Sequence, residues 1–306
     1  MVTAGWQVVS AAPSEVGESP FWHPQEQLLY WVDIPAKTIH RCNVFMATVD
    51  SWRMAAPHDL EPGCIAPAAG GGLVIALRDG IYRARSWGGA LEQLAAAGHN
   101  TATTRFNDGK CDPLGRFWAS TIYEPRDARN AALLCLQDGA LVRMTGDATV
   151  GNGLAWSADG GTLYWSDTTA HLIRAWDWDA AGNTLTNPRV FKQFPLKPAG
   201  WQPGSPEYGG RPDGAAVDRQ GNYWVAMFEG ARVLKLSPAG ELLDEIATPM
   251  ACPTMVCFGG DDLQTLYLTS ASHGRTAAEL AAMPLSGAVL SRRVDVPGLP
   301  VNFFSA

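Results

Sequence analysis

Four polar residues next to glycines stand out as candidates for chemistry: Glu18 after Gly17, Asn107 before Asp108-Gly109, Asn152 before Gly153, and Asp213 before Gly214. Carboxylate and amide oxygens, with no Cys or His among them, are ligands that hard divalent cations prefer. Three or four such ligands leave coordination positions for water and substrate, as in catalytic metal sites. These residue types predict a cation site if the fold brings them together.

A repeat of apolar strands indicates how the fold would do so. The repeated strands are separated by steps of 44, 43, 47, 59 and 43 residues, with centres at Trp31, Ile75, Trp118, Trp165, Trp224 and Tyr267. A period of about 40 to 50 residues carrying four strands is typical of a propeller blade. We therefore predict an all-β chain, a six-bladed β-propeller with four antiparallel strands per blade, in a single domain over residues 1–306.

The fourth repeat shows the predicted unit most plainly, as four runs rich in branched and aromatic residues: Asn152–Trp156, Leu163–Ser166, Leu172–Trp176 and Arg189–Phe194. Polar turns join the first two strands of several repeats, at 112–116, 157–161, 218–222 and 259–264. One short helical pattern lies near Thr276–Met283. The last blade runs out after three strands, near 289–294, so we expect the strand at Trp6–Val9 to complete it and close the ring.

The first strand of each propeller blade lines the central channel, so the residues that begin these strands converge. In this chain they are Glu18, Cys64, Asn107, Asn152, Asp213 and Thr254. Asn-Gly and Asp-Gly are also common turn dipeptides, which is the alternative interpretation. Their equivalent places in different blades favour a shared site instead. Burying two carboxylates and two amides together is unfavourable without a counter-charge, and a cation would supply it.

Composition excludes several function classes. A net charge of −7 without a basic cluster argues against a nucleic-acid partner. No apolar run approaches 18 residues and the first cation is Lys37, so we expect neither a signal peptide nor a membrane span. Six scattered cysteines indicate reduced core residues of a cytoplasmic protein. Neither paired zinc-binding histidines nor a G-x-S-x-G motif occurs. We expect a monomer or weak homo-oligomer.

Four segments in order resemble the senescence-marker-protein (regucalcin)/gluconolactonase family of sugar lactonases: Gly17–Trp22, Arg105–Arg116, Asn152–Ser157 and Pro212–Asp218. The resemblance spans nearly the whole chain. It implies a six-bladed propeller with one divalent cation (Ca²⁺, Mn²⁺, Mg²⁺, Fe²⁺ or Zn²⁺) held by Glu18, Asn152 and Asp213. It also implies hydrolysis of a sugar lactone, a small-molecule substrate, to the aldonic acid.

The resemblance implies that Arg105 and Asn107 hold the substrate. The family often has an acid after the second strand of blade three that contacts substrate hydroxyls, and Glu124, followed by Pro125, is the candidate for it with a one-residue shift in position. The alternative interpretation of Glu124 is a solvated loop acid. Asp213 is the expected proton acceptor from the attacking water. Two other functions stay open, a related metal-dependent esterase or phosphotriesterase and a non-enzymatic calcium-binding protein. Arg105 with Asn107 favours a polyhydroxylated substrate over an aryl phosphate.

Other polar residues have structural interpretations. We expect Asp108 and Lys110 to pair with each other, and Asp33 and Asp167, which end second strands at matching places, to hydrogen bond the backbone.

Two further expectations concern the walls and rim of the site. Cys64 and Thr254 would contribute wall instead of ligand. The longest step contains an insertion at 196–210, carrying Trp201 and Tyr208 directly before Asp213. It would overhang the site as a specificity loop, or be an inert surface excursion.

Overall fold

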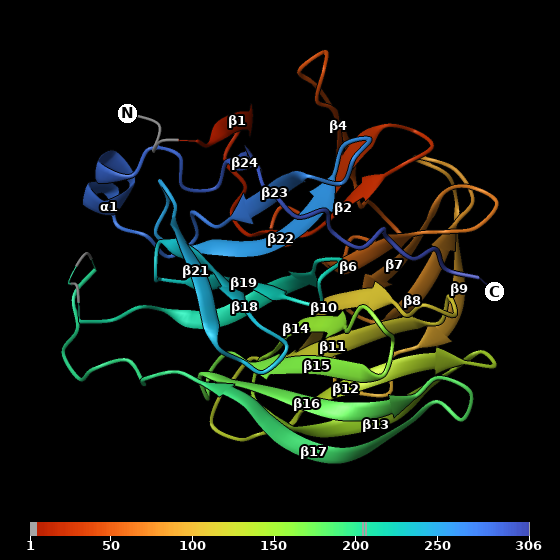
Figure 1. Cartoon of the computed structure of the whole chain (residues 1–306). Helices are drawn as coiled ribbons and strands as arrows, with labels where there is room; N and C mark the ends of the chain where they lie inside the picture. Colours follow the sequence, from red (N-terminus) through yellow and green to blue (C-terminus); the bar gives the residue numbers. More distant parts are fainter. Residues whose placement is uncertain (1–4, 204, 206, 306) are drawn as a thin grey trace.

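Six four-stranded antiparallel sheets surround a common centre, with their first strands innermost (Figure 1). The computed structural model describes residues 5–203, 205 and 207–305. This arrangement confirms the predicted six-bladed β-propeller. In blades one to five the strand order within each sheet follows the chain, which is what short hairpin turns between successive strands impose.

The innermost strands form the wall of the channel. They are β2 (Gly17–His23), β6 (Pro62–Pro67), β10 (Thr104–Cys111), β14 (Gly151–Trp156), β18 (Arg211–Val217) and β22 (Pro253–Gly259). Nearly all of their residues are buried, although many are polar at the amino-terminal end. The predicted strand entrances therefore do converge.

The second strands are the apolar repeat of the sequence, and the outer strands are more exposed. In chain order the remaining strands of blades one to five are β3 (Leu28–Asp33), β4 (Thr38–Asn43), β5 (Thr48–Arg53), β7 (Leu73–Leu77), β8 (Gly80–Ala84), β9 (Leu91–Ala96), β11 (Phe117–Tyr123), β12 (Ala131–Gln137), β13 (Ala140–Ala148), β15 (Thr162–Asp167), β16 (Leu172–Asp179), β17 (Thr184–Gln193), β19 (Tyr223–Phe228), β20 (Arg232–Leu236) and β21 (Leu242–Ala247). The outer strand of blade four begins at Thr184, five residues before its predicted start. Its first half pairs with β16 through polar and turn-forming residues, which carry a weak strand signal.

Both ends of the chain build the sixth blade. β22 pairs with β23 (Thr265–Ser270), β23 pairs with β24 (Val289–Arg293), and β24 pairs with β1 (Gln7–Ser10). This confirms the predicted closure by the amino-terminal strand. The outer edge of β24 is covered, so closure leaves no long unpaired edge there.

Two hairpin turns are fastened in the same way in blades three and five. The Asp112 carboxylate accepts the backbone N–H of Arg116 at 3.1 Å and the indole Nε1–H of Trp118 at 2.9 Å. Asp218 repeats this with the N–H of Asn222 and the indole of Trp224, both at 2.9 Å. Both carboxylates are fully buried, so these bonds satisfy groups that water cannot reach.

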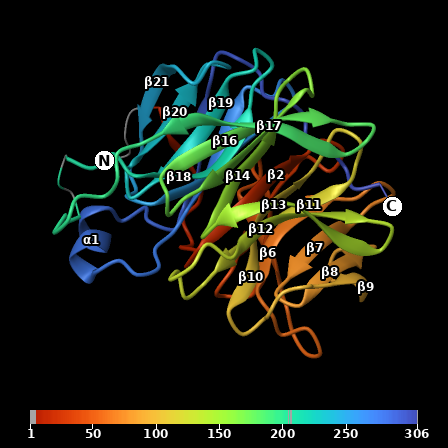
Figure 2. The ribbon, with the colours of Figure 1, turned by 90° about the horizontal axis from the view of Figure 1, so that it is seen from below.

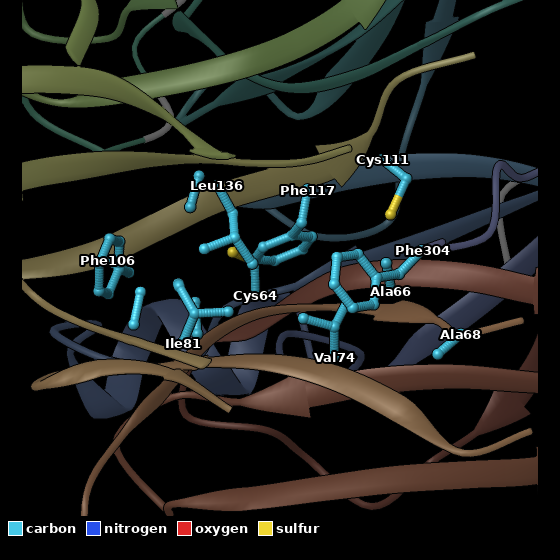
Figure 3. Packing of buried hydrophobic residues seen from close by; sticks show 13 residues of the cluster. Cys64, Ala66, Ala68, Val74, Ile81, Phe106, Cys111, Phe117, Leu136 and Phe304 are labelled. Atoms are coloured by element: carbon cyan, nitrogen blue, oxygen red, sulfur yellow. The ribbon is translucent and has the colours of Figure 1, made fainter. Parts of the chain in front are cut away.

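Apolar side chains fill the space between neighbouring blades. Figure 3 shows one such cluster, in which Cys64 and Ile81 of blade two pack against Phe106 and Phe117 of blade three. Phe304 from the end of the chain joins the cluster, and its backbone forms a bridge with Ala68. All six cysteines are buried and free, as predicted for reduced core residues.

One short helix, α1 (Ala277–Ala282), lies where the helical pattern was predicted, between β23 and β24. Thr276 and Glu279 form a capping box at its amino-terminal end. Figures 1 and 2 place α1 on the outside of the ring, beside the insertion that precedes β18. Among the described residues, no helix combines the length and apolarity needed to cross a bilayer.

Candidate active site

A cavity of about 330 Å³ lies at the end of the channel where the inner strands begin. All of the predicted site residues line it: Glu18, Arg105, Asn107, Glu124, Asn152 and Asp213. They come from blades one, three, four and five, so residues up to 195 positions apart meet in one volume. The structure thus brings together every residue that the sequence placed in the site.

An irregularity in the pairing of the first and second strands of each blade sets the direction of these side chains. Each inner strand shifts register against its second strand just after its entrance, for example between Asn152 and Ala155 and between Pro212 and Ala215. β-Bulges of this kind redirect side chains and are frequent beside active sites. Glu18 and Asn152 precede the shift, whereas Asn107 and Asp213 lie inside it. The entrances are therefore offset by one residue between blades and not strictly equivalent, as the sequence analysis had assumed.

A chain of hydrogen bonds fixes the two amides. The amide nitrogen of Asn107 donates to Oδ1 of Asn152 at 2.8 Å, and its oxygen accepts from Arg105 at 2.9 Å. The amide nitrogen of Asn152 donates to Oγ1 of Thr168 at 2.8 Å, and Thr168 donates to the Pro212 carbonyl at 2.8 Å. This network connects blades three, four and five and orients Asn152 with its oxygen toward Asn107. Thr168 is a site residue that the sequence analysis missed.

The two candidate carboxylate ligands are almost completely removed from water. Glu18 is 6 % exposed and Asp213 is 5 % exposed. Burial, followed by the negative charges of Asp213 and Asp108, raises the pKa of Glu18 well above its usual range. Burial also raises the pKa of Asp213, and the nearby Arg211 only partly opposes this. Two such groups in one cavity are unfavourable in their charged form unless a cation joins them.

Asp108 adds a third buried carboxylate beneath the site. Its Oδ2 accepts the backbone N–H of Leu154 at 2.8 Å, whereas its buried Oδ1 has no hydrogen-bond partner among the described residues. The ammonium group of Lys110 donates to the carbonyl of Ala215. The expected direct pairing of Asp108 with Lys110 is therefore wrong at hydrogen-bond distance, because Asp108 bonds to the backbone of blade four and Lys110 to that of blade five. Burial raises the pKa of Asp108, and the charge of Lys110 only partly opposes this.

Two arginines and two glutamates neutralise one wall of the cavity. Arg78 contacts both oxygens of Glu124, at 2.9 and 3.0 Å, and both oxygens of Glu61, at 2.9 and 3.2 Å. Arg105 lies 3.6 Å from Glu124 and also donates a hydrogen bond to the carbonyl of Phe106. Glu124 is therefore an ion-paired member of the cavity wall that is also partly exposed to solvent. Its contact with substrate stays a prediction.

The sequence analysis missed three arginines that line the cavity, namely Arg78, Arg126 and Arg211. A signal for Arg211 was present, because it stands two residues before Asp213 just as Arg105 stands two residues before Asn107. The two arginines occupy the same register position, one residue before the irregularity begins in their strands. Arg126 lies in the turn after β11, where the sequence gives no comparable repeat.

The expected structural roles of other residues can be compared with the contacts. Asp33 accepts the backbone N–H groups of residues 15 and 16, and Asp167 accepts those of residues 149 and 150, which confirms their matching roles. Thr254 lines the cavity, but Cys64 packs in the core between blades two and three. Cys64 is therefore core and not wall, because its strand turns its side chain toward blade three.

The 196–210 insertion contacts the site through an intermediate residue. Positions 204 and 206 lie outside the described residues, and none of the other residues of the insertion lines the cavity. Lys197 lies 3.0 Å from Glu229, which also pairs with Arg211. Tyr208 is buried and its hydroxyl lies 2.6 Å from the His171 ring. The loop therefore packs beside the cavity, and its effect on specificity stays a prediction.

The donor set fits a divalent cation of the hard type. Glu18, Asn152 and Asp213 offer only oxygen donors, and a cation between them would offset the mutual repulsion of the two buried carboxylates. Among the described residues, no three His, Cys, Asp or Glu side chains form a cluster that could hold a metal by themselves. A site here therefore depends on the amide oxygen of Asn152.

Comparison with known proteins agrees with this geometry. The family model described as the SMP-30/gluconolactonase/LRE-like region matches residues 16–272. The chain is 44 % identical to the 6-deoxy-6-sulfogluconolactonase of Pseudomonas putida, with 96 % of both chains covered, and 35 % identical to the regucalcin of Danio rerio, with 94 % of both covered. The fold matches a calcium-binding regucalcin from Agrobacterium tumefaciens with a TM-score of 0.89 at 22 % identity, covering 99 % of this chain and 98 % of that one. The chain belongs to the SMP-30/gluconolactonase/LRE-like family.

Proposed function

We propose that this protein hydrolyses a sugar lactone to the corresponding aldonic acid with the help of one divalent cation. The observation that carries the proposal is the convergence of Glu18, Asn152 and Asp213 with Arg105 and Asn107 in one buried cavity. The relatives named for gluconolactone-type substrates support the same reaction class. Arg105 offers N–H donors and Asn107 an amide oxygen acceptor, which suit hydroxyl groups, whereas an aryl phosphate would favour a more apolar pocket.

Glu18, Asn152 and Asp213 would hold the cation. When bound there, it would polarise the lactone carbonyl, lower the pKa of an attacking water and stabilise the developing oxyanion. The second carboxylate oxygen of Asp213 would accept the proton that the water loses. The water oxygen would then bond to the acyl carbon, the ring C–O bond would break, and the ring oxygen would take the proton held by Asp213 and leave as a hydroxyl group.

The remaining residues position the substrate. Arg105 is held by the Phe106 carbonyl and by Asn107, each at 2.9 Å, so its guanidinium group has a fixed direction. Thr168 keeps Asn152 oriented as described above. Val16, Ile34 and Ile122 give the same cavity an apolar part of its lining.

A titration assay tests the proposal. Protein stripped of metal would be given xylono-, arabinono-, galactono- and gluconolactones, with Ca²⁺, Mn²⁺, Mg²⁺, Fe²⁺ or Zn²⁺ added back, while acid release is followed. We expect at least one pair to exceed spontaneous hydrolysis clearly, and chelation to abolish the excess. Cation binding without acceleration of any lactone would instead support the non-enzymatic calcium-binding alternative.

A further inference from the structure

The arginines of the cavity fall into two groups with different surroundings. Arg78 and Arg105 are neutralised by Glu61 and Glu124, as described above. Arg126 has no ion-pair partner within 4 Å among the described residues. Its backbone is held at a φ of 59°, a left-handed conformation that side-chain-bearing residues seldom adopt. The first group is thus paired with carboxylates, whereas Arg126 is an exposed residue without an ion pair among the described residues.

Arg211 is the other arginine of the second group, and its charge is only partly paired. Its single ion pair is with Glu229 at 3.5 Å, and Glu229 is shared with Lys197 at 3.0 Å and with Arg275 at 3.5 Å. One carboxylate therefore serves three cations. The Nε of Arg211 is buried without a hydrogen-bond partner among the described residues, while its guanidinium carbon lies 5.1 Å from the Phe228 ring centre. Stacking on Phe228 fixes a guanidinium group that still has donors to offer.

Arg126 and Arg211 also influence each other. After burial, the charge of Arg211 is the largest influence that lowers the pKa of Arg126. Both guanidinium groups line the same cavity, where their like charges repel each other, and an anion bound between them would relieve this repulsion. Charge-assisted, bidentate hydrogen bonds make arginine pairs well suited to phosphate, sulfonate and carboxylate groups.

A competing explanation is that Arg211 simply offsets the buried charge of Asp213. The charges of the cavity argue against this as its whole role. Four carboxylates and four guanidinium groups line the cavity, so their formal charges cancel. A divalent cation held by Glu18 and Asp213 would then leave two positive charges in excess, and Arg211 would no longer be needed by Asp213.

We propose that Arg126 and Arg211 form a subsite for a fixed anionic group on the sugar lactone, remote from its carbonyl. The inference rests on the proposed lactonase function and narrows it to acidic sugar lactones. The lactone carbonyl lies at Glu18, Asn152 and Asp213, the ring hydroxyls at Arg105 and Asn107, and the anionic substituent at the wall formed by Arg126 and Arg211. Phosphate, sulfonate and carboxylate share the chemistry that this wall recognises.

The test compares lactones that differ in one substituent. Initial rates would be measured for glucono-1,5-lactone and for its counterparts carrying phosphate, sulfonate or carboxylate at C6, with the activating cation present. We expect kcat/KM to be roughly 10- to 100-fold higher for at least one anionic lactone than for the neutral one. The counterpart with the largest ratio identifies the anion. A ratio near one for all three would overturn the inference while leaving the lactonase function standing.

Variants connect the ratio to the two arginines. Arg126→Gln and Arg211→Gln should each lower the anionic-to-neutral ratio about tenfold or more, and Arg211→Lys should restore part of it. Arg129→Gln is the matched control, because Arg129 pairs with Asp147 at 3.2 Å and does not line the cavity. An equal fall of the ratio in the Arg129 variant, or no fall in the other two, would contradict the assignment.

A binding measurement separates this inference from the reaction itself. The corresponding aldonic acids, with and without the C6 anion, would be added to the wild-type protein and the shift of Tm measured. A larger shift with the acid carrying the C6 anion, lost in Arg211→Gln, supports the subsite even if no lactone is hydrolysed. Equal shifts for both acids count against it.

Discussion

The two ends of the channel contain cavities of similar size and opposite character. The site cavity of about 330 Å³ is lined by carboxylate, guanidinium and amide groups. The other, of about 350 Å³, is lined mainly by apolar side chains such as Phe21, Trp22 and Met255. The charged side chains on its described lining are Lys110 and Asp159.

The same inner strands line both cavities. β10, for example, gives Arg105 and Asn107 to one end and Lys110 and Cys111 to the other. Cavity volume therefore does not identify the site, because the propeller produces a hollow at each end. The residue types at the strand entrances identify it. We expect substitutions at the site end to change chemistry and those at the far end to change stability.

The largest expected effect tests whether substitutions at the site end of the channel change the reaction rate. Asp213→Asn should lower kcat/KM by about 10²–10⁴-fold, because the variant loses both a ligand charge and the proton acceptor. Initial-rate measurements at saturating cation would show it. Asp159→Asn, the same change in the far cavity, should keep wild-type rates, and near-normal turnover of the Asp213 variant would remove that residue from the mechanism.

The second prediction concerns stability and the hairpin turns at the far end of the channel. Asp112→Ala should lower the free energy of unfolding by about 3 kcal/mol, because the indole of Trp118 and the backbone N–H of Arg116 lose their buried acceptor. Urea denaturation would measure the loss. Asp218→Ala should behave alike in blade five, and rates per folded molecule should stay normal. A stable but inactive Asp112 variant would contradict the division between the two ends.

Removal of the cation should destabilise the protein through the site end alone. Chelation should lower the free energy of unfolding by about 2.7 kcal/mol relative to protein holding the ion at 100 times its Kd. Thermal unfolding with and without chelator would measure this. A double variant, Glu18→Gln with Asp213→Asn, should show no response to chelator. A full response would place the cation elsewhere.

Thr168→Val should give a smaller effect on the cation. The hydroxyl that orients Asn152 is lost while the shape is kept, so cation affinity should fall about 10- to 100-fold. Calorimetric titration would measure it. Thr121→Val is the control, since the Thr121 hydroxyl accepts the N–H of Ala132 at 2.8 Å within blade three. The Thr121 variant should bind the cation with unchanged affinity, although its free energy of unfolding falls.

Much of the fold was predictable because the signals are local. Second strands such as that around Trp165 are runs of branched and aromatic residues, and turns such as the one at Asp112 use residues that favour sharp reversals. The early start of β17 at Thr184 was not predictable, because its first half has little strand propensity of its own and is held by pairing with β16.

The site was predictable only for residues at strand entrances. Glu18 and Asn152 could be found because the repeat gives their register. The pairing of Arg78 with Glu124, 46 positions away, depends on side-chain directions across two blades, which no periodicity contains. Asp108 shows the same limit, since its carboxylate contacts the backbone of blade four and not the nearby Lys110.

The sixth blade joins both ends of the chain, so the ring can close only after nearly the whole chain has been synthesised. Ser10 pairs with Val289, so 279 positions of chain must be made between the two partners. At about 5–20 residues per second, a ribosome needs roughly 14–56 s for this. Glu18 emerges early in that interval and Asp213 much later, whereas the strand pair that closes the ring cannot form before Val289 has been made. The complete cavity is therefore a property of the finished chain, and a nascent chain stalled before Val289 would carry all of the proposed ligands without the closed ring that holds them.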